Sequence, residues 1–137
     1  MNRGNFQVLA ELRLREAEAL FAAGLPDGAY YLAGYAVECA LKACIAKRTK
    51  EYDFPEKSLV NESYTHNLKE LVRLALLKGD LELAIQEDPV METNWTIVQS
   101  WSENSRYARR TVIEASALLQ AVENQSGGIL PWVRQRW

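Results

Sequence analysis

The sequence predicts an all-α protein, and three observations carry this prediction. Apolar residues recur at helical spacing along most of the chain, and the first such series is Ala10, Leu14, Ala17 and Phe21. No segment shows the strict alternation of apolar and polar residues that is typical of a half-buried strand. The connection at residues 23–28 is short and rich in turn residues, which favours antiparallel neighbouring helices. We therefore expect an up-and-down bundle of about four or five helices.

The composition is that of one folded domain. With 137 residues, of which 48% are hydrophobic and 25% charged, the chain is long enough to bury a core as a single domain, residues 1–137. A net charge of -2 argues against binding nucleic acid or acidic membranes through a field of the whole molecule. Charge is nevertheless uneven, because residues 101–137 carry five arginines and three glutamates, whereas Gly79–Asn94 contains acids and no Lys or Arg. Any anion site is therefore expected toward the C-terminus.

The second predicted helix, Asp27–Lys47, is the most informative segment. It is apolar on nearly every side, which is typical of a helix buried among others. Glu38 and Lys42 interrupt it near its centre, so a core helix is expected rather than a membrane span. The two charges stand four residues apart, in the order that favours an ion pair. Three roles stay open for them: this ion pair, a pairing with Arg106 that organises the bundle, or a binding site.

The chain is expected to reside in the cytoplasm. Residues 1–16 carry charges within their first helical turns and lack a long apolar stretch, so we expect neither a signal peptide nor a transit sequence. Cys39 and Cys44 share the second helix about 140° apart, without a CxxC motif or neighbouring histidines. They are interpreted as small core residues in a reducing compartment. We expect no membrane association, no metal site and no cofactor.

The middle of the chain predicts a loop and two helical segments. The polar stretch at residues 48–66 is interpreted as a long loop, and such loops are often functional or mobile. Thr65 is expected to cap a third helix that ends near residues 78–79. A shorter helical piece, Leu81–Gln86, should end at Asp88, because a proline follows. The core face of the third helix is predicted to hold Leu68, Leu71, Val72 and Ala75.

The last third of the chain predicts two further helices and a packed tail. One helix is expected around Asn94–Trp101, and a final long helix at about Tyr107–Glu123. The tail is too apolar to lie free in solvent, so it should pack on the bundle or on a second subunit. Its apolar residues are Ile129, Leu130, Trp132, Val133 and Trp137.

Three motifs in this order resemble the HEPN domain family. They are DGAYYLAGYAVECALKACIAK at residues 27–47, YTHNLKELV at residues 64–72 and WSENSRY at residues 101–107, followed by the last long helix. The likeness covers most of the chain. It implies a helical bundle that usually dimerises, with a polar site near the dimer interface. Such families include ribonucleases of toxin–antitoxin and defence systems and helical partners of small nucleotidyltransferases.

The resemblance also implies where catalytic residues would lie. HEPN ribonucleases carry an Arg followed, with four to six residues between, by a His at the start of the last helix. Arg106 matches the Arg, but no His occurs in the run from Tyr107 to Glu114. The single histidine, His66, replaces the missing one only if the third helix begins beside Arg106.

The polar residues allow both structural and functional interpretations. His66 is either a residue of a helix-capping region or a catalyst. Arg106 and Tyr107 either anchor the last helix or, with Arg109 and Arg110, hold phosphate at its positive end. Trp95 and Trp101 are interpreted as core or interface aromatics, with base stacking as the alternative.

These observations predict a HEPN-type accessory module that binds nucleotide or RNA. It would be a homodimer and would act beside a small nucleotidyltransferase in a toxin–antitoxin or defence pair. Its ligand-binding residues would be Arg106, Tyr107, Arg109, Arg110 and Lys42. One alternative is a metal-independent HEPN ribonuclease in which Arg106, Glu38 and His66 form a non-standard active site. Another alternative is a dimerising scaffold without a ligand.

Overall fold

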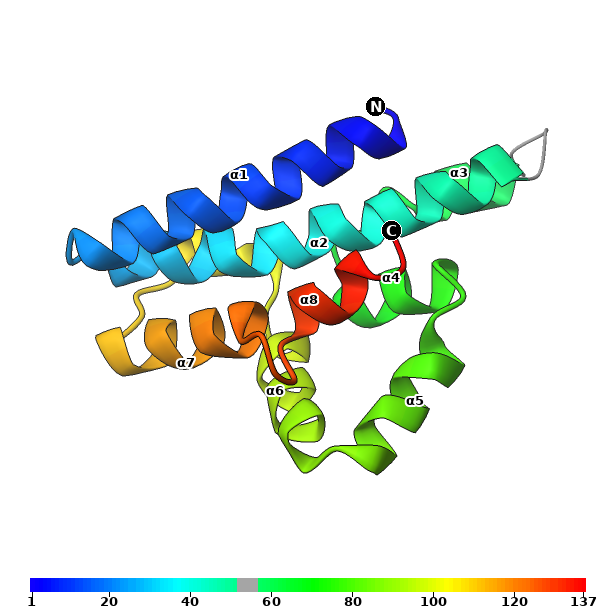
Figure 1. Ribbon diagram of the computed structural model, residues 1–137. Helices are drawn as coiled ribbons and strands as arrows, with labels where there is room; N and C mark the ends of the chain where they lie inside the picture. The colour runs from blue at the N-terminus through cyan, green and yellow to red at the C-terminus, as the bar shows by residue number, and fades with distance from the viewer. Residues whose placement is uncertain (52–56) are drawn as a thin grey trace.

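The computed structural model describes residues 1–51 and 57–137, and within these residues it contains helices and no strand (Figure 1). The all-α prediction is therefore confirmed. The described part holds more helices than the four or five expected, because several of them are short. Their bounds are α1 (Arg3–Ala22), α2 (Pro26–Glu51), α3 (Lys57–Glu62), α4 (Leu68–Leu74), α5 (Lys78–Glu87), α6 (Pro89–Gln99), the 3-10 helix η1 (Glu103–Tyr107), α7 (Val112–Glu123) and α8 (Ile129–Arg134).

Helix α2 is the centre of the fold. It runs antiparallel to α1, and it also contacts α4, α7, α8 and η1 (Figure 1). Helices α5 and α6 form a corner that projects away from this pair (Figure 1). Because neighbours cover α2 on several sides, its apolar residues are buried around most of its circumference, which explains the pattern in the sequence.

The first helix and its connection follow the sequence closely. The side chain of Asn2 accepts a hydrogen bond from the backbone N–H of Asn5 and so caps α1. Gly24 has a φ of 77°, a left-handed conformation that glycine adopts without strain, and it ends the helix where the sequence predicted a turn. The predicted core residues Ala10, Leu14 and Ala17 are buried against α2.

The segment at residues 48–66 differs from the predicted loop. Helix α2 continues to Glu51, and α3 occupies Lys57–Glu62, while residues 52–56 lie outside the described residues. Thr65 is not the cap of the next helix. The side chain of Asn67 accepts the backbone N–H of Glu70 at 3.1 Å, and α4 begins at Leu68.

The third predicted helix ends earlier than residues 78–79. Helix α4 stops at Leu74, because Leu76 takes a left-handed conformation with a φ of 61° and reverses the chain. The N–H of Leu77 then donates to the carbonyl of Val72 at 3.0 Å. Helix α5 starts at Lys78 and ends before Asp88, as the following proline predicted.

The next two helices begin at positions other than those expected. Pro89, not Asn94, opens α6, and the Asp88 side chain accepts the N–H of Val90 at 2.9 Å. The last long helix starts at Val112 rather than Tyr107, because Thr111 and Glu114 form a capping box at its N-terminus.

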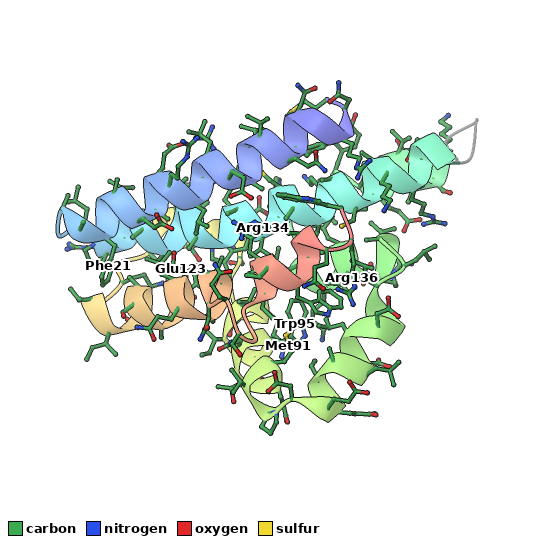
Figure 2. All side chains as sticks on the ribbon, in the orientation of Figure 1. Phe21, Met91, Trp95, Glu123, Arg134 and Arg136 are labelled. Carbon is green, nitrogen blue, oxygen red and sulfur yellow. The ribbon has the colours of Figure 1, made fainter. Side chains whose placement is uncertain are left out.

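The C-terminal tail packs on the bundle of its own chain. Ile129, Leu130 and Val133 of α8 are buried, and Met91 and Trp95 of the neighbouring α6 lie next to this helix (Figure 2). Trp132 and Trp137 are half-buried against the same core. Arg134 reaches α1, where its Nε donates to Glu11 at 2.6 Å. The tail therefore closes the core between α1, α2, α6 and α7.

Both cysteines are free and buried, as the sequence predicted. Burial raises the pKa of the Cys39 thiol to about 12 and that of Cys44 to about 11. Thiols of this kind are protonated and unreactive near neutral pH, so they act as core residues.

Glu123 at the end of α7 makes the stability of the fold depend on pH. Burial and the neighbouring Glu18 carboxyl raise the pKa of Glu123 to about 7. The Glu123 carboxyl therefore holds its proton more tightly in the folded state than in the unfolded state. Its contribution to the free energy of unfolding is fully present below about pH 4 and is lost as the pH rises through 7. We expect the wild type to lose more stability than Glu123→Gln in urea unfolding between about pH 5 and about pH 8.

The exposed Glu82→Gln serves as the control for this comparison, because Glu82 lies on the solvent side of α5 and its loss removes the same carboxylate charge. It should follow the wild type at every pH. An identical pH dependence for Glu123→Gln and the wild type would contradict the assignment.

Candidate functional site

A buried carboxylate lies at the centre of the candidate site. Glu38 of α2 is only 2% exposed. The ammonium nitrogen of Lys42, one turn further along α2, lies 3.3 Å from a carboxylate oxygen of Glu38, so the ion pair that the sequence predicted is present. A buried charge needs such a partner, because its hydration is lost on folding.

His66 is the second partner of Glu38. Its Nδ1 lies 3.0 and 3.1 Å from the two carboxylate oxygens of Glu38. Its Nε2 lies 3.3 Å from Glu103, at the start of η1. The Nδ1 contacts with Glu38 are hydrogen bonds, whereas the Nε2 contact with Glu103 is an ion pair that forms when the ring is protonated. The histidine therefore ties the segment before α4 to α2 and to η1.

Arg106 lies in η1 and does not pair with Glu38, whose partners are Lys42 and His66. Its guanidinium lies over the ring of Tyr107, 5.0 Å from the ring centroid. Tyr107 is 79% exposed, so this pair faces solvent instead of anchoring α7. No acid forms an ion pair with Arg106 among residues 1–49 and 57–137, whose side chains the structure describes.

Arg109 and Arg110 have different surroundings. Arg109 meets Asp27 of α2 at 2.8 Å, yet its side chain is 94% exposed. Arg110 is half-buried, with its guanidinium 4.2 Å from the ring centroid of Tyr30 and 3.3 Å from a Glu114 oxygen. Arg110 therefore anchors the segment before α7, whereas Arg109 stays open to solvent.

The N-terminus of α7 is occupied by a capping box. The Thr111 hydroxyl accepts the N–H of Glu114, and the Glu114 carboxylate, which accepts the N–H of Thr111, places its negative charge at this helix end. Hydrogen bonds from Thr111 lower the pKa of Glu114. Of the arginines predicted to hold phosphate at this helix end, Arg106 and Arg109 have exposed side chains, and the phosphate site itself stays a prediction.

A pocket of about 220 Å³ lies beside the carboxylate–histidine cluster. It is formed by the start of α4, the end of α6 and the start of η1. The sequence did not indicate it, because its two halves lie about thirty residues apart and meet only in the folded chain. The lining residues are Thr65, His66, Asn67, Leu68, Lys69, Gln99, Trp101, Ser102, Glu103 and Asn104.

The two tryptophans near this region are core residues, as the first of the two interpretations predicted. Trp95 is buried, and Trp101 is 3% exposed. The ring of Trp101 stacks on Tyr31, with centroids 6.0 Å apart and planes at 25°. Neither ring is open for stacking with a base.

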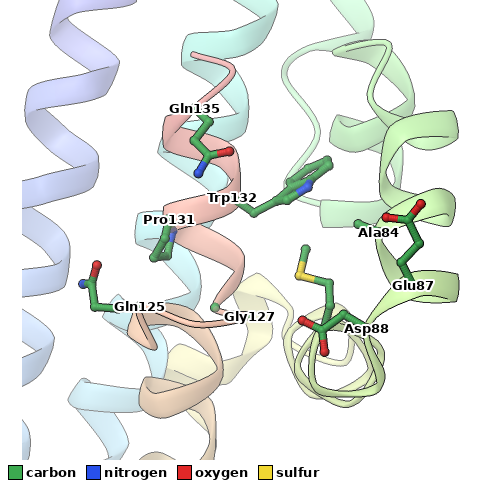
Figure 3. A pocket seen from close by; sticks show the side chains of 10 residues that line it. Ala84, Glu87, Asp88, Gln125, Gly127, Pro131, Trp132 and Gln135 are labelled. Carbon is green, nitrogen blue, oxygen red and sulfur yellow. The ribbon is translucent and has the colours of Figure 1, made fainter.

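A second pocket, of about 240 Å³, lies between α5, α6 and α8 (Figure 3). Figure 3 shows Trp132 on one side and the acids Glu87 and Asp88 on the other. No Lys, Arg or His lines it, and none of the predicted site residues lies there. An anion such as phosphate would meet only negative charge in this pocket.

No group of three or more His, Cys, Asp or Glu side chains that could hold a metal occurs in the described residues. Among the same residues no helix is long and apolar enough to cross a membrane.

A family model of the HEPN domain matches residues 9–125, which is most of the chain. The chain belongs to the HEPN domain family. This match confirms the resemblance that the three sequence motifs indicated. No curated protein and no solved structure matches the chain significantly.

The structure shows what occupies the positions where this HEPN chain lacks the catalytic histidine. With Arg106 as the first residue of the catalytic pattern, the histidine would fall at residues 111–113, which are Thr111, Val112 and Ile113. Thr111 is the cap of α7, and the two residues after it are exposed. His66 does not occupy that place, but its partner Glu103 lies in the same short helix as Arg106. Sequence reasoning missed Glu103, although it stands inside the WSENSRY motif.

Proposed function

We propose that this chain is an accessory HEPN module that binds RNA or nucleotide without cleaving it. It acts as a homodimer in the cytoplasm, beside a small nucleotidyltransferase in a toxin–antitoxin or defence pair. One observation supports binding above all: Arg106 is exposed on η1 beside an exposed tyrosine, with no acid paired to it among the described residues. Guanidinium groups bind phosphate in two-pronged geometry, and exposed aromatic rings stack on unpaired bases.

The interior groups favour a structural role over catalysis. The buried Glu38 is paired with Lys42 and with the half-buried His66, and the family histidine is absent after Arg106. Lys42 neutralises the Glu38 carboxylate, and among the solvent-facing arginines Arg109 is paired with Asp27, so Arg106 is the arginine left for a ligand.

The dimer is the second part of the proposal. Val112 and Ile113 follow the arginine-bearing segment, and Ile113 is 81% exposed. Apolar residues of this kind beside a polar site are typical of a surface that a second copy covers. A dimer joined through these residues would bring the Arg106–Arg109 segments of both copies together, which suits an extended ligand such as RNA.

Binding is tested with labelled RNA of mixed sequence at a fixed, low salt concentration. Arg106→Ala should lower the affinity about tenfold, because one charge-assisted phosphate contact is lost. The slope of log affinity against log salt should fall by about one. Arg15→Ala is the matched control, because Arg15 is exposed on α1 and its loss removes the same charge. Equal losses in both variants would contradict a site at Arg106, and no binding by the wild type would favour the scaffold without a ligand.

A metal-independent ribonuclease is a second candidate, favoured by the geometry of His66. A buried carboxylate orients the imidazole through Nδ1, and a pocket lies at the ring, as in sites where histidine acts as a general base. Cleavage of RNA in the presence of a chelator, lost in both His66→Gln and Arg106→Ala, would establish this function in place of binding alone. RNA that stays intact with the wild type would exclude it.

A further inference from the structure

We propose that the pocket between α4, α6 and η1 holds one unpaired nucleobase of the bound RNA or nucleotide, and that Gln99 and Asn104 read its edge. This inference rests on the proposed function, in which Arg106 takes the phosphate. It adds a subsite that distinguishes one base from another.

The size of the pocket suits a single ring system. Its volume of about 220 Å³ is below the roughly 300–1,000 Å³ of sites that hold drug-sized ligands. A whole nucleotide would therefore extend out of the pocket, with its sugar and phosphate toward solvent. The base alone is the part that fits.

The chemistry of the lining suits the edge of a base. Gln99 and Asn104 contribute amides, and Thr65 and Ser102 contribute hydroxyls. Each of these groups offers both donors and acceptors, as the edges of nucleobases do. Neither amide of Gln99 and Asn104 has a hydrogen-bond partner within the part of the chain that the structure describes, so both are free for a ligand.

The position of Arg106 relative to the pocket suits one nucleotide. In a 3-10 helix, side chains three residues apart lie above one another on the same side, with a rise of about 2 Å per residue. Glu103 lines the pocket, and Arg106 stands three residues later in η1. The arginine therefore lies about 6 Å further along the same side of this helix. A phosphate there is one sugar away from a base in the pocket.

The pocket is held open before a ligand arrives. His66 is fixed by Glu38 on one side and Glu103 on the other. Trp101 lines the pocket from the core, packed against Gly34 and stacked on Tyr31. A preformed site of this kind loses little entropy when it binds. Because a base must leave its stack to enter, duplex RNA should bind more weakly than unpaired RNA.

The test compares four short labelled homopolymers, a mixed-sequence duplex and the four ribonucleoside monophosphates as competitors. The wild type should prefer unpaired RNA to duplex and should rank the four bases. The double variant Gln99→Ala with Asn104→Ala should bind about tenfold more weakly and lose that ranking. Arg106→Ala should weaken all four homopolymers equally and keep the ranking. Gln86→Ala, an exposed amide on α5 outside the pocket, should match the wild type.

The outcomes separate this inference from the proposed function. If Arg106→Ala weakens binding while the double variant binds like the wild type, the base subsite is wrong and the function stands. Equal binding of all homopolymers, or of duplex and unpaired RNA, also overturns the subsite. Absence of binding by the wild type overturns both. Competition by free monophosphates assigns the pocket to a free nucleotide, and binding of the homopolymers alone assigns it to RNA.

Discussion

Glu38→Ala is expected to lower the free energy of unfolding by about 3 kcal/mol. The substitution removes a carboxylate that is 2% exposed and leaves Lys42 and His66 without their shared partner. Breaking a buried ion pair from one side is costly, because the remaining charge stays poorly hydrated. Urea unfolding followed by circular dichroism measures the loss.

Two further variants decide whether the charge pair causes this loss. Glu38→Met with Lys42→Met should recover much of the stability, because apolar residues of similar volume replace buried pairs with little cost. Glu62→Ala, which breaks an exposed ion pair with Arg73, should change stability by less than about 1 kcal/mol. A loss for Glu38→Ala as small as that of Glu62→Ala would contradict a buried, partnered carboxylate.

Gly34→Ala is expected to destabilise the protein by about 1–3 kcal/mol, although alanine is the better helix former. A Cβ at this position would lie 2.3 Å from three atoms of the Trp101 ring. The ring is buried and stacked on Tyr31, so it has little room to move. Thermal unfolding would measure the loss, and near-ultraviolet circular dichroism would report the displaced tryptophan.

Gly79→Ala is the matched control for this position. Gly79 also lies in a helix, but a Cβ there would meet nothing within 4 Å. We expect it to raise stability by about 0.5–1 kcal/mol. If Gly34→Ala also raised stability, the close contact between α2 and Trp101 would be wrong.

The features that the sequence predicted correctly depend on residue spacing within single helices. The apolar run around Glu38 and Lys42 marked α2, and their spacing along one helix predicted the ion pair, because both residues lie on the same element. The all-α class followed from the same periodicity. The apolar tail could only pack on a core, although the sequence left open whether that core belonged to this chain or to a second one.

The features that the sequence did not predict are a cluster built from distant segments and the ends of two helices. His66 meets Glu38 and Glu103 only after three segments fold together, so no spacing reveals the cluster. Leu76 ends α4 in a left-handed conformation that usually requires glycine, so the sequence carried no stop signal. Thr111 and Glu114 form a capping box that moved the start of α7 five residues beyond Tyr107. This shift leaves Arg106 on a separate short helix, where its side chain faces solvent.

The central claim is that the protein binds RNA through Arg106 without cleaving it. Its most direct test incubates labelled mixed-sequence RNA, in buffer that contains a chelator, with the wild type or with Arg106→Ala and analyses the products on native and denaturing gels. We expect the wild type to retain the RNA intact and the variant to retain about tenfold less. Shortened RNA with the wild type, absent with the variant, would contradict binding without cleavage. Equal retention by both proteins would contradict the role of Arg106.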